Sequence, residues 1–194
     1  MQITPFILGS GKAANAIMES LAVIPIAKPG TSILPVQRLK RGDPIEHNGA
    51  VNPVLLIANP HALHAKSILE GERAGFALIV CEKPAAVSLR QLEQLQNVKV
   101  PVAVCHGYRQ MWGPQTLKEM IDADEFGEII SIEGRYWQSS TAEQAMTGAT
   151  TQGWKNDPEL SGPSDALIDI GSHWVDTALF LVGEPPDDVS LWLS

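Results

Sequence analysis

The sequence has few cysteines, no long hydrophobic run and no basic N-terminal segment, and each absence excludes a class of protein. Its two cysteines, Cys81 and Cys105, are too few for a disulfide framework and too far apart for the ligand spacing of a zinc site. No apolar run reaches the roughly 20 residues that span a bilayer. No basic stretch precedes an apolar run at the N-terminus, so we expect no secretory signal. We therefore expect a cytoplasmic protein with reduced thiols and no metal.

Positive charge is scarce in the second half of the chain. Residues 1–110 carry 11 lysines and arginines against 7 acidic residues, whereas residues 111–194 carry 3 against 15, and the net charge is −8. The mildly basic first half suits an anionic cofactor. The acidic second half argues against binding to nucleic acid or acidic membranes, although a solvated acidic surface explains it equally well. We therefore expect a small-molecule substrate.

The composition, with 44% hydrophobic and 19% charged residues, is that of a globular protein with a sizeable core. In the first half, short apolar runs alternate with helical patterns, which is typical of β-α-β units and a parallel sheet. The predicted strands are Ile3–Leu8, Ile33–Gln37, Val54–Ala58, Ala77–Cys81 and Val100–Cys105. The predicted helices are Lys12–Leu21, His64–Gly75 and Leu89–Leu95, the last capped by Ser88.

The pattern changes at two places. Arg38–Pro53 is rich in turn-forming residues, so we expect no full crossover helix between the second and third strands. After His106 we expect a helix at Trp112–Asp124, a half-exposed strand at Ile129–Ser139, a loop at Thr141–Pro163, a helix in the later part of Asp165–Val182 and a strand from Val189. The fold class is therefore predicted to be α/β, with a Rossmann-type parallel sheet over residues 1–105 and a partial α+β second domain over residues 106–194.

A glycine-rich turn follows the first predicted strand. Gly9-x-Gly11-x-x-Ala14 has the spacing of a dinucleotide-binding fingerprint between a strand and a helix. The first glycine permits the tight turn, the second lets backbone approach a pyrophosphate, and the small Ala14 allows close helix packing. We therefore predict cofactor contacts from Gly9, Ser10, Gly11, Lys12, Ala13 and Ala14. Methyltransferases also carry glycine-rich turns after a first strand, so that class remains open.

No acidic residue stands where an NAD-specific protein usually reads the ribose. That position, at the end of the second predicted strand, holds Val36-Gln37-Arg38-Leu39-Lys40-Arg41, which contains three cations. Asp or Glu at this place bonds the ribose 2′-hydroxyl, whereas Arg accommodates a 2′-phosphate. We therefore predict NADP, with NAD as the second choice, and Arg38 as a binding residue. The alternative is that these three cations are ordinary surface charges.

Two further segments follow strands whose carboxyl ends face the ligand crevice of an open α/β sheet. Their polar and turn residues are predicted to contact the cofactor. These residues are Asn59, Pro60, His61 and His64 after the third strand, and Glu82 and Lys83 after the fourth. Each histidine taken singly is better explained as a helix-start group with no role. Metal ligation by His61 and His64 fits their spacing but lacks further ligands nearby.

Lys83, Asp169 and His173 have the chemistry needed to take a proton from an alcohol. Lys83 ends an apolar strand, where lysine is seldom buried unless paired, and its ammonium can stabilise an alkoxide. A cis bond before Pro84 would fix where Lys83 points. Asp169 and His173 are four residues apart, so on a helix they share a face, and Asp176 lies on the same side. The Asp169 carboxylate can then select the tautomer of the His173 imidazole. The alternatives are a salt-bridged pair closing the strand and a core histidine with a structural acid.

Several motifs occur in an order and spacing that identify a family. The pieces are the glycine turn at Gly9–Ala14, Asn59-Pro60-His61-x-x-His64, Glu82-Lys83-Pro84, His106-Gly107-Tyr108-Arg109, Gly127-Glu128-Ile129, Trp154-Lys155 and Asp169-x-x-x-His173-x-x-Asp176. Together they resemble the Gfo/Idh/MocA family of NAD(P)-dependent oxidoreductases. The resemblance covers nearly the whole chain.

The resemblance implies roles for six residues and a class of substrate. The catalytic group would be Lys83, Asp169 and His173, with Arg109, Lys155 and Asp176 nearer the substrate. The implied reaction interconverts an alcohol and a ketone on a sugar, polyol or related cyclic alcohol. Family members are usually longer and carry Arg where this chain has Lys155, so we expect a second domain shortened at the C-terminus, whose open sheet favours a homo-oligomer. A non-catalytic NAD(P)-binding sensor or regulator, or a truncated remnant, is the alternative function.

Overall fold

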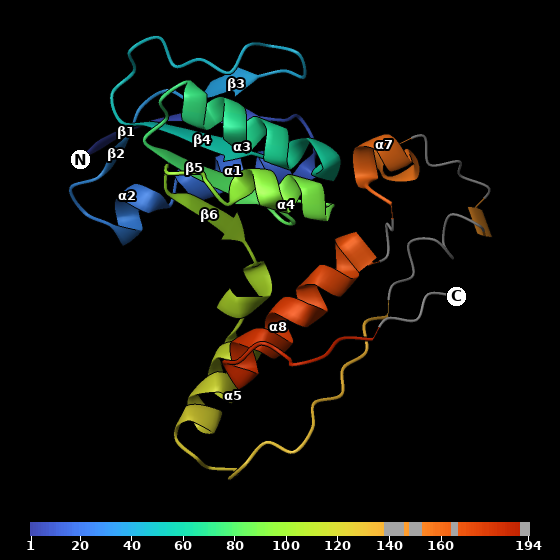
Figure 1. The fold of residues 1–194 in the computed structure, drawn as a ribbon. Coiled ribbons are helices and arrows are strands. Elements are labelled where there is room, and N and C mark those ends of the chain that lie inside the picture. Colours follow the sequence, from blue (N-terminus) through green and yellow to red (C-terminus); the bar gives the residue numbers. More distant parts are fainter. Residues whose placement is uncertain (138–145, 148–152, 164–166, 191–194) are drawn as a thin grey trace.

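A parallel sheet with helices on both sides forms the first half of the protein (Figure 1). The computed structural model describes residues 1–137, 146–147, 153–163 and 167–190. The strands are β1 (Gln2–Leu8), β2 (Ser32–Ile33), β3 (Gln37–Leu39), β4 (Pro53–Ile57), β5 (Leu78–Glu82) and β6 (Val102–Cys105). They pair in the order β2-β1-β4-β5-β6, with β3 also beside β1, and every pair is parallel. The predicted α/β class is confirmed.

Helices connect these strands. They are α1 (Lys12–Leu21), α2 (Ile24–Ala27), the 3-10 turn η1 (His61–Leu63), α3 (His64–Arg73) and α4 (Leu89–Leu95). The predicted cap of α4 is confirmed, because Ser88 Oγ accepts a hydrogen bond from the Gln91 amide at 3.3 Å. The agreement with the predicted helices follows from their regular apolar spacing.

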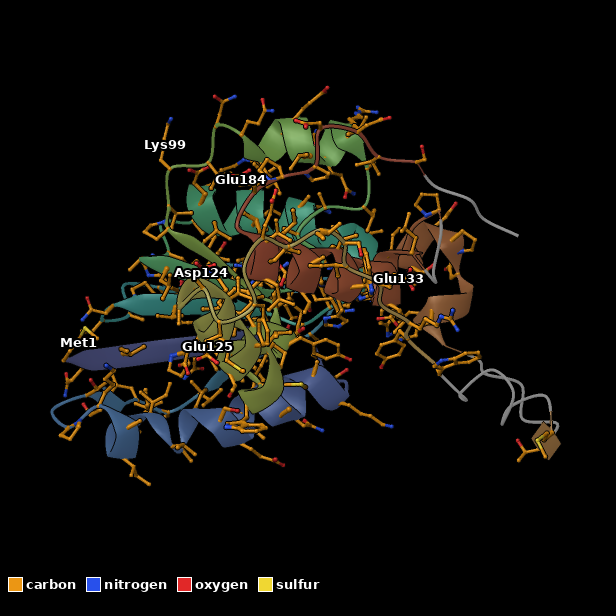
Figure 2. All side chains as sticks on the ribbon, turned by 90° about the horizontal axis from the view of Figure 1, so that it is seen from below. Met1, Lys99, Asp124, Glu125, Glu133 and Glu184 are labelled. Atoms are coloured by element: carbon orange, nitrogen blue, oxygen red, sulfur yellow. The ribbon has the colours of Figure 1, made fainter. Side chains whose placement is uncertain are left out.

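Two clusters of buried side chains, one on each face of the sheet, hold the helices in place. Phe6 and Leu8 of β1 belong to one cluster and the intervening Ile7 to the other, since successive strand residues point to opposite faces. Ile68 of α3 joins the first cluster and Ala14 of α1 joins the second. Figure 2 shows the strands between these two helical layers. Apolar burial on both faces therefore stabilises this half of the chain.

The second predicted strand is the one element of this half that needs correction. Instead of one strand over Ile33–Gln37, the structure has the short strands β2 and β3 on either side of Pro35. Proline has no backbone N–H to donate to a neighbouring strand, so it interrupts the ladder here. The segment Arg38–Pro53 contains turns and no helix, as predicted.

Beyond Cys105 the described residues form helices and turns. The elements are η2 (Gly107–Gln110), α5 (Trp112–Asp122), η3 (Trp154–Asn156), α7 (Pro158–Ser161), the π-helical turn η4 (Leu167–Gly171) and α8 (Ser172–Val182). In Figure 1, α5 and α8 lie side by side below the sheet, and they are in contact. Helix α8 ends at Gly183, whose φ of +86° suits a residue without a Cβ. The domain boundary near residue 105 stays a prediction.

The strand predicted at Ile129–Ser139 is wrong for residues 129–137, which have no regular structure. Alternating polarity makes a strand only beside a partner that completes the hydrogen bonds, and no described residue supplies one here. Ile130 is 95% exposed, so the alternation buries little. Residues 138 and 139 of this predicted strand lie outside the described residues. Of the strand predicted from Val189, residues 189–190 are irregular and residues 191–193 lie outside the described residues. The predicted loop Thr141–Pro163 holds η3 and α7 in its described part.

The two cysteines are free thiols in the sheet. Cys81 is buried and Cys105 is half-buried, where burial raises the pKa of the Cys105 thiol to about 11. In the described ranges, no helix is both long enough and apolar enough to cross a bilayer. The same residues contain no cluster of three side chains able to hold a metal ion.

Candidate active site

The turn after β1 brings the backbone close to the end of β4. Gly9 has a φ of +137°, and a Cβ there would overlap the carbonyl oxygen of Ala58. Only glycine satisfies both conditions. A Cβ on Gly11 would instead meet no protein atom within 4 Å, so this glycine faces open space. Helix α1 begins one residue later, and no side chain caps the free backbone N–H groups of its first turn.

A cavity of about 420 Å³ lies over this turn. Its lining joins the ends of β1, β3 and β4 to one residue of the second half, Trp154. The lining residues are Leu8, Gly9, Ser10, Gly11, Arg38, Leu39, Lys40, Arg41, Ala58, Asn59, Pro60 and Trp154. Six predicted cofactor residues are among them, namely Gly9, Ser10, Gly11, Arg38, Asn59 and Pro60. The other predicted ones lie behind or beside the cavity.

Arg38 is held at the edge of the cavity by the first helix. Its Nη2 donates to Asn15 Oδ1 at 2.8 Å and lies 3.5 Å from the sulfur of Met18. Lys40 and Arg41 follow it along the same wall. Three cations therefore stand on one side of the cavity. Ala14, by contrast, is fully buried beneath α1, and Lys12 and Ala13 are exposed on it.

His64 ties together the turns that follow β4 and β5. Its side chain is fully buried, with Nδ1 2.7 Å from the Pro84 carbonyl oxygen and Nε2 2.8 Å from that of Asn59. Burial lowers the pKa of His64, while the two carbonyl oxygens favour a protonated ring and act in the opposite direction. His64 therefore positions the two turns from behind the cavity. Asn59 Nδ2 donates to Ser67 Oγ at 2.9 Å, which anchors the same turn to α3.

His61 is buried between the two halves of the chain. Its ring lies 4.7 Å from that of Trp154, nearly perpendicular to it, and 5.7 Å from that of His64. Burial, followed by the positive charges of His64 and Lys83, lowers the pKa of His61 to about 4. The ring is therefore neutral near pH 7, and its edge packs Trp154 against the cavity.

Lys83, Asp169 and Lys155 form one charged cluster. The peptide bond between Lys83 and Pro84 is cis, as the sequence suggested. Lys83 is buried, with 7% of the residue exposed. Its Nζ donates to the Asp169 carbonyl oxygen at 2.6 Å and to Asp169 Oδ1 at 2.8 Å. Lys155 donates to Asp169 Oδ2. Burial alone would raise the pKa of Asp169, but the hydrogen bonds from Lys155 and Lys83 outweigh it and lower the pKa to about 2.

A second carboxylate, Asp176, is occupied by Arg109. Its two oxygens accept from Arg109 Nε at 2.8 Å and Nη2 at 2.6 Å, the two-pronged geometry that guanidinium and carboxylate favour. The Arg109 guanidinium also lies 5.5 Å from the centre of the Phe180 ring. His106 Nδ1 lies 3.5 Å from Asp176 Oδ2, and burial lowers the pKa of His106. The pair thus fastens η2 to α8.

His173 lies near the charged cluster of Lys83, Asp169 and Lys155 but makes no hydrogen bond to Asp169. Among the described residues its Nδ1 has no hydrogen-bond partner, and both Asp169 carboxylate oxygens accept from lysines. Asp169 belongs to the π-helical turn η4, directly before α8, and its carboxylate is bonded by the two lysines and not by the imidazole. The imidazole stacks on Tyr108, with ring centres 4.4 Å apart and planes 14° from parallel.

Three residues of this site were missed by reasoning on individual side chains. Tyr108, His106 and Trp154 were noted only as parts of matching motifs, yet they contact His173, Asp176 and His61 respectively. Their sequence neighbours were informative: Tyr108 precedes Arg109 and Trp154 precedes Lys155. A charged residue brought to a site by a short turn carries its neighbour there too.

A Rossmann-type sheet with a glycine turn and a cavity at the strand ends defines a nucleotide-binding class of fold, and comparisons with known proteins give the family. Residues 115–194 match the family model described as the GFO/IDH/MocA C-terminal domain. Levoglucosan dehydrogenase of Pseudarthrobacter phenanthrenivorans is 31% identical over 135 residues, covering 68% of this chain and 33% of that protein. Glucose-6-phosphate 3-dehydrogenase of Bacillus subtilis is 25% identical over 131 residues, 66% of this chain and 36% of that protein. Residues 115–194 thus match the Gfo/Idh/MocA family, in agreement with the resemblance of the sequence motifs.

Solved structures share the fold. The structure of levoglucosan dehydrogenase in complex with NADH has a TM-score of 0.74 at 24% identity and covers 95% of this chain and 55% of that one. An NAD binding oxidoreductase from Klebsiella pneumoniae has a TM-score of 0.75 at 20% identity, with 94% and 54% covered. The chain thus spans about a third of the length of these curated relatives and about half of the structural ones.

Proposed function

We propose that this chain carries the cofactor site and catalytic group of an NAD(P)-dependent oxidoreductase. The reaction interconverts an alcohol and a ketone on a sugar, polyol or related cyclic alcohol. One observation carries the proposal: Lys83 and Asp169, 86 positions apart in sequence, are bonded beside a cavity built on a glycine turn. Lys155 extends that cluster to Trp154, which lines the cavity. The names of the relatives, which are sugar dehydrogenases, support the substrate class.

The residues of the cavity fit a dinucleotide. Gly9, Ser10 and Gly11, with the N-terminus of α1, would hold the pyrophosphate, because free backbone N–H groups and the helix dipole favour anions. Asn59 and Pro60 would line the opposite wall. When bound, the nicotinamide ring supplies the acceptor for a hydride. Lys12, Ala13, Ala14, His61, His64 and Glu82 would support these contacts from the surrounding turns.

NADP is the preferred cofactor in this proposal, with NAD second. Arg38, Lys40 and Arg41 stand on one wall of the cavity, where their charges favour a 2′-phosphate. The titles of related structures name NADH and NAD+. Those proteins are at most 24% identical to this chain, so their cofactor does not decide the preference here.

In this proposal His173 is the base and Lys83 stabilises the alkoxide. The substrate hydroxyl gives its proton to the neutral imidazole. Burial and the charge of Lys83 lower the pKa of this imidazole. Lys83 has three N–H donors, of which Asp169 accepts two, so one can meet the substrate oxygen. Asp169 then orients Lys83 and Lys155, whereas the sequence led us to expect that it orients the His173 imidazole. Arg109, Lys155 and Asp176 are proposed to border the substrate.

Titration calorimetry and a turnover assay test this function together. We expect the chain to bind NADP more tightly than NAD and to oxidise at least one member of a panel of sugars and polyols. The variant Lys83→Ala should lower turnover by a factor on the order of 10² or more while the cofactor Kd stays within about twofold. Unchanged turnover in Lys83→Ala would remove Lys83 from the mechanism.

The same experiment separates the alternatives. Cofactor binding without turnover on any substrate would favour a sensor or regulator. Binding of S-adenosylmethionine in place of a dinucleotide would favour a methyltransferase. Neither result is expected, because Lys83 keeps one N–H donor beyond its two bonds to Asp169, which suits a bound hydroxyl or carbonyl oxygen.

A further inference from the structure

The proposed base, His173, is in contact with Tyr108, a residue outside its own helix α8. Nδ1 of His173 finds no hydrogen-bond partner among the described residues, and Asp169 is engaged by two lysines. An imidazole that no hydrogen bond holds can rotate about its Cβ–Cγ bond. In this structure one face of the ring is covered by the parallel ring of Tyr108 at 4.4 Å. That contact therefore limits how the imidazole can turn.

Tyr108 is itself held from two directions. Its neighbour Arg109 is bonded twice to Asp176, which lies one helical turn after His173 on α8. The Arg109 carbonyl also accepts from the side chain of Gln115 on α5. The turn η2 that carries Tyr108 is thus tied to both helices, and its backbone cannot move away from α8 without breaking these bonds.

Tyr108 is also in contact with Tyr136. The two rings lie 6.4 Å apart with planes 19° from parallel, and the Tyr108 hydroxyl donates to that of Tyr136 at 3.2 Å. The segment that carries Tyr136 runs close along α8, since a Cβ on Gly134 would overlap the indole of Trp174. The hydrogen bond to Tyr136 raises the pKa of Tyr108 to about 12, so the phenol stays neutral at ordinary pH. The result is a three-ring stack of His173, Tyr108 and Tyr136.

We propose that Tyr108 is the positioning residue for His173, holding the imidazole in one orientation in place of the usual carboxylate partner. This inference rests on the proposed function of His173 as the base. Parallel stacking keeps the ring plane fixed and engages neither ring nitrogen in a hydrogen bond. The charged and titratable groups that bear on this imidazole are Lys83, His106, Asp169 and Asp176, and Tyr108 adds no charge.

Proton NMR of the imidazole tests the placement without any need for turnover. A ring stacked on tyrosine experiences its ring current, so the carbon-bound protons of His173 should resonate upfield of those of an exposed histidine. Tyr108→Leu should remove that shift and move the titration of His173 to higher pH, because water reaches the uncovered face. Tyr108→Phe should retain the upfield position. The variant His173→Gln identifies the resonance.

Kinetics test the consequence. Tyr108→Leu should lower kcat on the order of ten- to a hundredfold with the cofactor Kd unchanged, and Tyr108→Phe should restore most of that loss. Phe126→Leu is the matched control, because Phe126 is 59% exposed and outside the stack. A His173 resonance and titration that are the same in Tyr108→Leu as in the wild type would overturn the inference. A wild-type chain that shows the ring-current shift but no turnover would instead contradict the proposed function and leave the placement supported.

Discussion

The two halves of this chain are held together by different forces. With the exception of Leu181, every apolar residue that is fully buried in the described ranges lies before residue 106. After that point large apolar side chains such as Trp112 and Ile130 are 82% and 95% exposed. The first half is thus stabilised mainly by non-directional apolar burial, whereas the second half contacts it through directional polar bonds, such as that of Lys83 with Asp169, and the ring contact of His61 with Trp154.

The two halves therefore have different roles: the first half stabilises the fold, and the second half completes the candidate site. The sheet provides a rigid edge where Gly9, Asn59 and Lys83 are presented, and the second half brings Asp169 and His173 to that edge. Removing a core residue should therefore destabilise the fold, whereas removing a polar bond near the edge should change the site more than the fold. The following predictions test that division, from the largest expected effect to the smallest.

A core deletion in the sheet should have the largest effect. Leu55 is fully buried in β4, so Leu55→Ala should lower the free energy of unfolding by about 2–5 kcal/mol, through lost transfer energy and a cavity. The matched change in the second half, Ile130→Ala, should stay within about 0.5 kcal/mol because the side chain is exposed. Urea denaturation measures both. Equal losses at the two positions would mean that the halves share one core.

Acid should weaken the contact between the halves through His61. Its pKa is 6.5 as a free group and about 4 here, so between these values the unfolded chain binds more protons than the folded one. The free energy of unfolding should therefore fall as the pH is lowered from 6.5 to 4, by at most about 1.4 kcal/mol per pH unit from this group. His61→Phe, which keeps an aromatic edge against Trp154, should flatten the dependence. An unchanged slope in that variant would assign it to other groups.

Breaking the Arg109–Asp176 pair should have a smaller effect. Arg109→Met leaves the Asp176 carboxylate, 10% exposed, without its strong donor and should cost about 1–3 kcal/mol, since the guanidinium itself is 41% exposed. Lys118→Met, in an ion pair with the more exposed Asp122, should cost under about 0.5 kcal/mol. Thermal unfolding compares the two. A cost for Arg109→Met no larger than for Lys118→Met would show that the pair does not anchor η2.

The glycine turn allows a test confined to the cofactor cavity. Gly9→Ala places a methyl group on the Ala58 carbonyl and should weaken NADP binding by roughly tenfold, as the turn must shift. Gly30→Ala is the control: it also has a positive φ, +87°, but its Cβ would meet nothing within 4 Å. Calorimetry with NADP measures both. Equal affinities in the two variants would place the cofactor elsewhere.

Sequence patterns predicted the first half better than the second because its elements are determined locally. Val54–Ala58 is apolar throughout and became the buried centre of the sheet as β4. Ile129–Ser139 alternates as a strand does, yet residues 129–137 form none, since a strand also requires a neighbour that no local pattern encodes. Pro35 divided a strand at the point where its missing N–H would have been needed.

The candidate site shows the same limit. Lys83 and Asp169 could be selected from residue chemistry, and the structure places them in one bond. The expected bond from Asp169 to His173 is not formed, because both Asp169 carboxylate oxygens accept from lysines. Tyr108 could not be selected at all, because an aromatic residue in a short turn has many structural uses.

The amino-acid order alone determined the alternation of strands and helices, the glycine turn and the identity of the charged groups, because these depend on side chains close together in sequence. Only the tertiary structure decided which of those groups meet. It assigned Asp169 to two lysines and gave His173 an aromatic neighbour, since contacts between distant residues depend on how whole helices and turns pack against one another.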